Sequence, residues 1–236
     1  MFLNNLIIFY INLDSREDKN LVAINQLEST TFPFQRISAV KYTEINESKI
    51  AYKYFRLVSA VKESHMKAYR EFVSGNYDLA LILEDDFKLH QTKFQVEIEE
   101  AFHLMQEKKI DFLQLGHLTY IENSPKNSIL GCYVRYLIEY GFRFVTFLRH
   151  PFTPIVVNHI RWGAQAYLIN KRAGQSLINL LDTESEAPID KELRRLSNMS
   201  NAEVNAFSVA RLKKNMIKQN LIFSSDTQGV VGRFPD

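Results

Sequence analysis

Three consecutive acids, Glu84, Asp85 and Asp86, directly follow the apolar run of residues 79–83. Neighbouring carboxylates raise one another's pKa, so a fold that keeps three of them ionised usually supplies a cation. If the backbone stays extended, the side chains of Glu84 and Asp86 face one way and that of Asp85 faces the other. Two hard oxygen ligands suit Mg²⁺ or Mn²⁺ that also holds a diphosphate. We therefore predict a metal site here; the alternative is an acidic start to a solvated loop or a cap of the next helix.

Short apolar runs and helical patterns alternate along the chain. They predict strands at residues 6–11, 34–37, 79–83, 112–115 and 164–169, and helices at 58–73, 94–107, 173–181, 189–196 and 204–217. A further helix is expected after the first strand, capped by Asp14 or Ser15. This alternation predicts an α/β fold with a mostly parallel sheet. In such a sheet ligands bind at the carboxyl ends of the strands, where the acidic triplet would lie.

Composition and length are those of an ordinary globular chain. The 236 residues suit one domain, and the formal charge of +2 gives no signal for nucleic acid or acidic partners. Cys132 is the only cysteine, which excludes an intrachain disulfide and favours a reducing compartment. The N-terminal stretch MFLNNLIIFYINLD lacks a basic leader, and its apolar run is too short for a membrane span. We therefore expect a cytoplasmic protein.

Six short motifs follow one another along the chain: INLDSREDK, FQRISAV, ESH, LILEDD, GAQAYLINKRAG and PID. In this order they resemble glycosyltransferase family 25, which includes lipopolysaccharide galactosyltransferases and collagen galactosyltransferases. The resemblance covers nearly the whole chain. The family often has a glycine–cysteine pair shortly before the Ser-His, where this chain has SAVKE at residues 59–63.

The resemblance implies a GT-A-like, Rossmann-type fold and a reaction. The donor would be a UDP-sugar, usually UDP-galactose, bound with Mn²⁺ or Mg²⁺, and the sugar would pass with inversion to a glycan acceptor such as lipopolysaccharide. Residues 1–236 would form a single domain, with a nucleotide-sugar-binding half at 1–118 and an acceptor-side half at 119–236. Two alternatives stay open: a non-catalytic binding module on the same fold, and a different magnesium enzyme of the phosphohydrolase or nuclease type.

The resemblance also implies roles for individual residues. Asp86 would be the direct metal ligand, and Glu84 would reach the metal or the donor ribose. The other residues of the predicted donor site are Asn12, Asp14, Arg16, Ala39, Val40, Ser64, His65, Asp85 and Gly163. From the residues alone, Asn12, Asp14 and Arg16 fit a helix cap with surface charge equally well, and a lone helical His is more often packed or solvent-facing than catalytic.

Asp190 is the candidate for the base that an inverting transfer needs. A sugar hydroxyl is a poor nucleophile near neutral pH, so a carboxylate or His must take its proton. The triplet would be occupied by the cation, and PID at residues 188–190 is similar to the Pro-Val-Asp of the family. Asp190 could instead bind the acceptor, or it could simply cap the helix that follows.

Aromatic and basic residues interleave between Tyr133 and Phe152, within a stretch, residues 132–157, that predicts a small hairpin insertion. Such a segment could rest on a membrane surface, grip a lipid-anchored glycan or hold single-stranded nucleic acid. A twisted hairpin whose aromatics fill the core is the favoured interpretation. We expect no nucleic-acid partner and at most peripheral contact with the inner face of the membrane. The sequence leaves the oligomeric state open.

Overall fold

The centre of the fold is one mixed sheet. The structure, a computed structural model, describes residues 5–46, 52–116, 155–157, 165–181, 185, 187–198, 208–212 and 218–219. Within these residues seven strands form the sheet in the order β2-β1-β3-β7-β5-β8-β6. The strands are β1 (Leu6–Asn12), β2 (Phe34–Ser38), β3 (Leu79–Glu84), β5 (Phe112–Gly116), β6 (Ile155–Val157), β7 (Ala166–Asn170) and β8 (Val209–Leu212).

Most strands of this sheet run in one direction. β1 is parallel to both β2 and β3. β7 is antiparallel to β3 and to β5, so β5 has the direction of β3, and β8 is parallel to β5. Only β7 and β6 run the other way among these strands. β4 (Phe87–Lys88) and β9 (Lys218–Gln219) pair in a separate small sheet. The predicted α/β fold with a mostly parallel sheet is confirmed.

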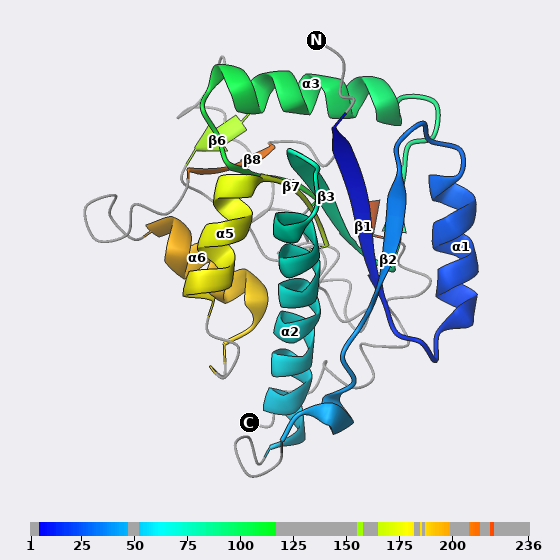
Figure 1. The fold of residues 1–236 in the computed structure, drawn as a ribbon, viewed down its shortest axis with the longest axis vertical. Coiled ribbons are helices and arrows are strands. Elements are labelled where there is room, and N and C mark those ends of the chain that lie inside the picture. The colour runs from blue at the N-terminus through cyan, green and yellow to red at the C-terminus, as the bar shows by residue number, and fades with distance from the viewer. Residues whose placement is uncertain are drawn as a thin grey trace, which may run out of the picture.

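Helices cover both faces of the sheet (Figure 1). They are α1 (Glu17–Leu27), α2 (Lys53–Ser74), α3 (Phe94–Glu107), α5 (Lys171–Leu180) and α6 (Ile189–Asn198), with a short 3₁₀ turn, η1 (Tyr42–Glu44). Leu6, Ile8 and Tyr10 of β1 share a buried cluster with α1 and α3, and the alternate β1 residues share one with α2, α5 and α6. All of β1 is buried, which explains why it reads as a continuous apolar run.

The helix predicted at residues 204–217 is wrong. Strand β8 lies there, between β5 and β6, and Ala210 is fully buried in the sheet. The segment contains good helix formers, but the backbone NH groups of Asp111 and Phe112 both donate to the Ser208 carbonyl at 3.0 Å and start a parallel ladder. Pairing with an otherwise open strand outweighs local propensity.

The predicted cap of the first helix is also wrong. α1 begins at Glu17, and its N-cap residue is Arg16, whose side chain makes no capping hydrogen bond. The carboxylate of Asp14 instead accepts hydrogen bonds from Arg36 and Ser38 of β2. Asp14 therefore links the ends of two neighbouring strands.

Two further predictions concern the hairpin insertion and membrane contact. Apart from β6, the predicted hairpin insertion at residues 132–157 lies outside the described residues, as does most of the aromatic segment. Among the helices that the structure describes, none is long and apolar enough to cross a membrane.

Candidate functional site

The parallel strands β1, β2 and β3 bring most of the predicted site residues to one edge. Asn12 pairs in register with Ser38, and Ile11 pairs with Glu84, so the three strands end side by side. The segments that continue from these ends carry Asp14 and Arg16, Ala39 and Val40, and the acidic triplet. The carboxyl edge of the sheet is therefore the candidate site, as expected for a parallel sheet.

The negative charge of Asp85 is neutralised by a cation that the protein itself provides, the side chain of Lys19. The Nζ of Lys19 lies 2.8 Å from Asp85 Oδ1, and Asn12 Nδ2 donates to Asp85 Oδ2 at 2.8 Å. Lys19 is only 4% exposed. Lys19 was not predicted as a site residue, yet the sequence holds a signal for its burial: it precedes Ala23 and Leu27 by four and eight residues, so it lies on the buried face of α1.

Asn12 joins this ion pair to a second one. Its Oδ1 accepts from Arg36 Nε at 3.1 Å, and Arg36 also pairs with Asp14, 2.5 Å away. Hydrogen bonds from Ser38 and Arg36 lower the pKa of Asp14. The Asn12 side chain is buried and fully engaged within the protein, so its role at the edge is to hold the loops that follow β1 and β2.

Arg16 lies in the loop after β1, where it forms a two-pronged ion pair with Asp18. Its Nε and Nη2 donate to the two carboxylate oxygens of Asp18 at 2.9 and 2.8 Å. These hydrogen bonds lower the pKa of Asp18 to about 2. Arg16 is partly exposed, so it could also meet a phosphate at the edge.

Ser64 fastens the segment after β2 to helix α2. Its hydroxyl donates to the Ala60 carbonyl at 2.6 Å and accepts from the Val40 NH at 2.9 Å. The Ala39 NH donates to the Asn12 carbonyl at 3.0 Å. The backbone at Ala39 and Val40 is therefore fixed from two sides, and Ser64 is a buried clamp.

His65 meets Glu84 across the interface between α2 and β3. Its Nε2 lies 3.4 Å from Glu84 Oε1, and its Nδ1 lies 2.6 Å from the hydroxyl of Tyr167. The hydroxyl of Tyr69, one turn further along α2, lies 2.6 Å from the Tyr167 hydroxyl. His65 is fully buried, whereas Glu84 is partly exposed. Two residues of the predicted donor site, His65 and Glu84, therefore lie in contact, and Tyr69 and Tyr167 are neighbours that were not predicted.

The acidic triplet does not continue the strand. β3 ends at Glu84, and Asp85 and Asp86 form a turn before β4, so the extended alternation assumed from the sequence stops at Glu84. Asp86 is 6% exposed. No group of three or more His, Cys, Asp or Glu side chains in the described ranges is arranged as a metal site. Glu84 and Asp86 supply hard oxygens and fit an ion that completes its shell with diphosphate and water.

Asp190 is the second residue of helix α6. The helix begins at Ile189, and Asp190 Oδ1 accepts from the NH of Lys191 at 3.0 Å. Asp190 is half-buried, in the first turn, where an acid suits the helix dipole. Asp190 is therefore not the N-cap of α6: the residue before the helix is Pro188, two positions earlier, and its carbonyl accepts from the Glu192 NH.

A buried lysine fastens α6 to α2. Lys62, fully buried, donates to the carbonyl and, at 2.8 Å, to the hydroxyl of Ser185. The Ser185 hydroxyl donates to Glu192 Oε1 at 2.8 Å, and Arg195 pairs with the other oxygen of Glu192 at 2.9 Å. Lys62 precedes His65 by three residues, so the two share one side of α2. The start of α6 is therefore held against the same stretch of α2 that contacts Glu84.

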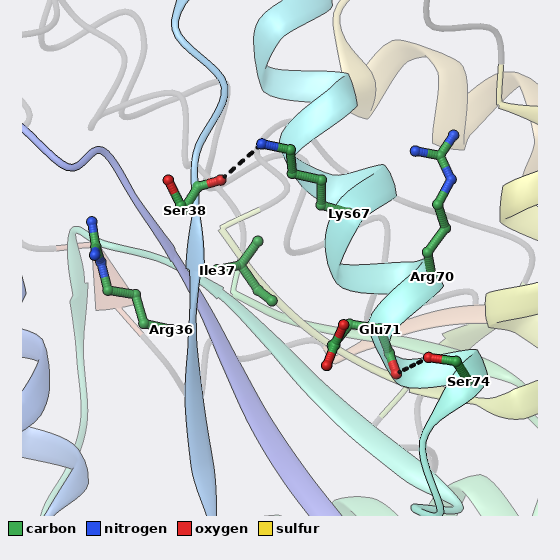
Figure 2. A pocket seen from close by; sticks show the side chains of 7 residues that line it. All are labelled: Arg36, Ile37, Ser38, Lys67, Arg70, Glu71 and Ser74. Carbon is green, nitrogen blue, oxygen red and sulfur yellow. Dashed lines mark hydrogen bonds between the residues drawn. The ribbon is translucent and has the colours of Figure 1, made fainter.

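A groove of about 510 Å³ lies beside this edge, between β2 and α2. Its lining residues are Arg36, Ile37, Ser38, Lys67, Arg70, Glu71 and Ser74. Figure 2 shows Lys67 reaching from α2 to the Ser38 carbonyl, 3.3 Å away, whereas Arg36 points away from the helix. The groove starts at the carboxyl end of β2 and leads away from the acidic triplet along α2. Gly163, a predicted donor-site residue, lies outside the described residues.

Comparison with known proteins assigns the family. The sequence pattern of glycosyltransferase family 25, described as LPS biosynthesis proteins, matches residues 5–193. No curated protein sequence matches the chain. Among solved structures, the "crystal structure of a glycosyltransferase involved in the glycosylation of the major capsid of PBCV-1" is similar at 14% identity and a TM-score of 0.36, over 83% of this chain and 68% of that one. Because the family pattern spans most of its length, the chain belongs to glycosyltransferase family 25.

Proposed function

We propose that this glycosyltransferase is metal-dependent and inverting, and that it moves galactose from UDP-galactose to a glycan acceptor such as lipopolysaccharide. Membership of the family supports a sugar donor and an acceptor. The observation that supports the metal and the donor is the acidic end of β3, where Glu84 and Asp86 lie at the carboxyl edge of the sheet and the third acid, Asp85, is paired with Lys19.

Glu84 and Asp86 would hold Mn²⁺ or Mg²⁺ together with the donor diphosphate. When bound, such an ion stabilises the negative charge that develops on the departing UDP. The protein's own part is to present one carboxylate at the end of β3 and the other in the turn that follows it. The Glu84 NH donates to the Gln165 carbonyl at 3.0 Å, which ties this end of β3 to the start of β7.

The loops after β1 and β2 would receive the nucleotide. Their backbone is held by the bonds of Asn12, Arg36 and Ser64 described above, so little ordering is needed on binding. Asp14 and Arg16 keep exposed side-chain surface at this edge, which suits contact with ribose and phosphate. A rigid edge of this kind supports orientation of the donor.

Asp190 would take the proton of the acceptor hydroxyl. Its carboxylate lies at the start of α6, which the Lys62–Ser185–Glu192 bonds hold against α2. A general base has to be held in place near the hydroxyl that it deprotonates, and a fixed start of α6 supports such a role for Asp190. The acceptor oxygen would bond to the anomeric carbon on the face opposite UDP, while the bond from that carbon to UDP breaks and UDP leaves.

Donor binding and transfer by the purified chain test this proposal. We expect UDP-galactose with Mn²⁺ to raise the melting temperature, because a ligand that binds only the folded state stabilises it. Without the ion the shift should be much smaller. UDP release that depends on a lipopolysaccharide acceptor would then report transfer. No Mn²⁺-dependent shift with UDP-galactose, or with other UDP-sugars, would contradict the proposed donor and metal.

Replacement of one carboxylate tests the metal site directly. Asp86→Ala should abolish the Mn²⁺-dependent shift while the protein stays folded, because relieving repulsion between acids does not destabilise the fold. Glu100→Ala, on the exposed side of α3, removes an acid elsewhere and should leave the shift unchanged. A folded Asp86→Ala protein that still binds the donor with Mn²⁺ would refute the assignment.

A further inference from the structure

A chain of four buried or half-buried polar groups leads from the core to the acidic edge. It runs from the Tyr69 hydroxyl to the Tyr167 hydroxyl, then to His65 Nδ1, and from His65 Nε2 to Glu84. The two tyrosines and His65 are fully buried. The Tyr167 ring also stacks on His65, at 5.8 Å between ring centroids, and on Phe112, at 4.7 Å. The position of each hydrogen-bonding atom is therefore set by packing.

The hydrogen bonds between these four groups can run in either direction, and one direction gives every proton an acceptor. Burial raises the pKa of both tyrosine hydroxyls, so each keeps its single proton. If Tyr69 donates to Tyr167 and Tyr167 donates to His65 Nδ1, the ring proton is on Nε2 and points at the Glu84 carboxylate. Every proton then has an acceptor, and both nitrogens of a neutral His65 ring have a hydrogen-bond partner.

The opposite order leaves groups unsatisfied. If His65 Nδ1 donates to Tyr167 and Tyr167 donates to Tyr69, the Tyr69 proton meets no acceptor that the structure gives among the described residues. A neutral ring would then direct the bare lone pair of Nε2 at Glu84 Oε1, 3.4 Å away, which is repulsive. Buried polar groups without partners are costly, so this order is disfavoured.

Within the part of the chain that the structure describes, little else orients the Glu84 side chain. Its backbone NH is bonded to the Gln165 carbonyl, which fixes the strand end but leaves the side-chain torsions open. Among the described side chains, His65 is the one for which the structure gives a contact with the Glu84 carboxylate. The direction of the His65 N–H therefore decides where this carboxylate points.

We propose that Tyr167 is a positioning residue: by donating its hydroxyl proton to Nδ1, it fixes His65 in the Nε2–H form, and His65 in turn orients Glu84 at the donor end of β3. The effect of this arrangement on ligand binding rests on the proposed function, in which Glu84 binds the metal and the donor. The order of protons itself follows from the geometry alone. Groups behind a ligand commonly fix its orientation in this way.

The ring form of His65 is measurable in the whole protein. Long-range ¹H–¹⁵N NMR of the histidine rings, with the His65 signals identified by their loss in His65→Gln, should show Nε2 protonated and Nδ1 bare. In Tyr167→Phe, which keeps the stacked ring, a fraction with the proton on Nδ1 should appear. Tyr10→Phe removes another buried hydroxyl, bonded to Asn20 on the other face of the sheet, and should leave His65 unchanged.

Binding of Mn²⁺ alone gives the second readout. By calorimetry we expect Tyr167→Phe to weaken Mn²⁺ by about tenfold, and Tyr10→Phe to stay within about twofold of the wild type. A wild-type ring protonated on Nδ1, or a Tyr167→Phe protein whose His65 is unchanged, would overturn the proposal. Absence of Mn²⁺ binding by the wild type would instead contradict the proposed metal, and the NMR comparison would still decide the order of protons.

Discussion

At the scale of single residues, the acidic triplet combines two different kinds of carboxylate. Asp85 faces Lys19 and Asn12 inside the protein, whereas Glu84 lies at the partly exposed end of the strand, in contact with His65. Three adjacent acids would repel one another strongly if all were left to a bound ion. Lys19 neutralises one of the three negative charges, which lowers the repulsion among the acids. The edge can therefore stay folded before a ligand binds.

The Asp85–Lys19 pair is expected to stabilise the fold rather than bind ligand. Asp85→Asn leaves the buried Lys19 facing a neutral group and should lower the free energy of unfolding by about 3 kcal/mol, because a buried charge loses its counter-charge. The double variant Lys19→Met/Asp85→Asn should lose less than the sum of the two single variants. Urea denaturation measures all three.

An exposed ion pair provides the control for this cycle. Arg16 and Asp18 are paired at the same shortest distance, 2.8 Å, but the Asp18 side chain is 54% exposed. Asp18→Asn should change the unfolding free energy much less than Asp85→Asn, because water screens the exposed pair. Strictly additive effects of Lys19→Met and Asp85→Asn would show that the buried pair contributes nothing.

Asp190→Asn distinguishes a base from a helix-terminal residue. The asparagine Oδ1 can still accept from the Lys191 NH, so stability and donor binding should match the wild type. Its amide cannot take a proton, and transfer to a competent acceptor should fall by on the order of a hundredfold or more. Full transferase activity in this variant would place the base elsewhere.

At the scale of elements, helix α2 organises the site. Ser64 clamps the segment after β2, His65 reaches Glu84 of β3, and Lys62 holds the start of α6. These three residues lie within one turn of a 22-residue helix. Any tilt of α2 would therefore move the nucleotide loop, the acidic edge and the proposed base together.

The fastening of α6 should be visible as local stability. Lys62→Met keeps much of the side-chain volume but removes the donor to Ser185, so Glu192 loses a link to α2. We expect faster amide hydrogen exchange in α6, with α3 unchanged, because segments open locally when their own contacts weaken. Equal acceleration in α6 and α3 would indicate global destabilisation instead.

The sequence predicted elements that depend on local pattern and missed contacts made at a distance. The helix at Phe94–Glu107 and the buried strand before the triplet follow from periodicity and apolar runs. β8 was mistaken for a helix because its place beside β5 is decided by pairing, which propensity does not encode. Lys19 and Tyr167 were missed for the same reason: each gains its role from a partner more than 60 residues away.

At the scale of the whole molecule, the two halves of the chain share one sheet. β7, from the second half, lies between β3 and β5 of the first, and it pairs with both. Its residues Tyr167, Leu168 and Ile169 are fully buried, in the clusters on the two faces. The predicted donor half at 1–118 and acceptor half at 119–236 would therefore differ in role only, because they share one sheet and are not separate folding units.

This interleaving predicts that residues 1–118 do not fold by themselves. Without β7, β3 would have an open, fully apolar edge and β5 would lose the neighbour that joins it to β3, so the buried clusters would be exposed. We expect the 1–118 fragment to show no near-ultraviolet circular dichroism and no sigmoidal urea transition, whereas residues 1–236 unfold in one cooperative step under the same conditions. A fragment that unfolds cooperatively and binds UDP-galactose with Mn²⁺ would show the opposite: that the first half is a domain, and that β7 adds to a core already complete.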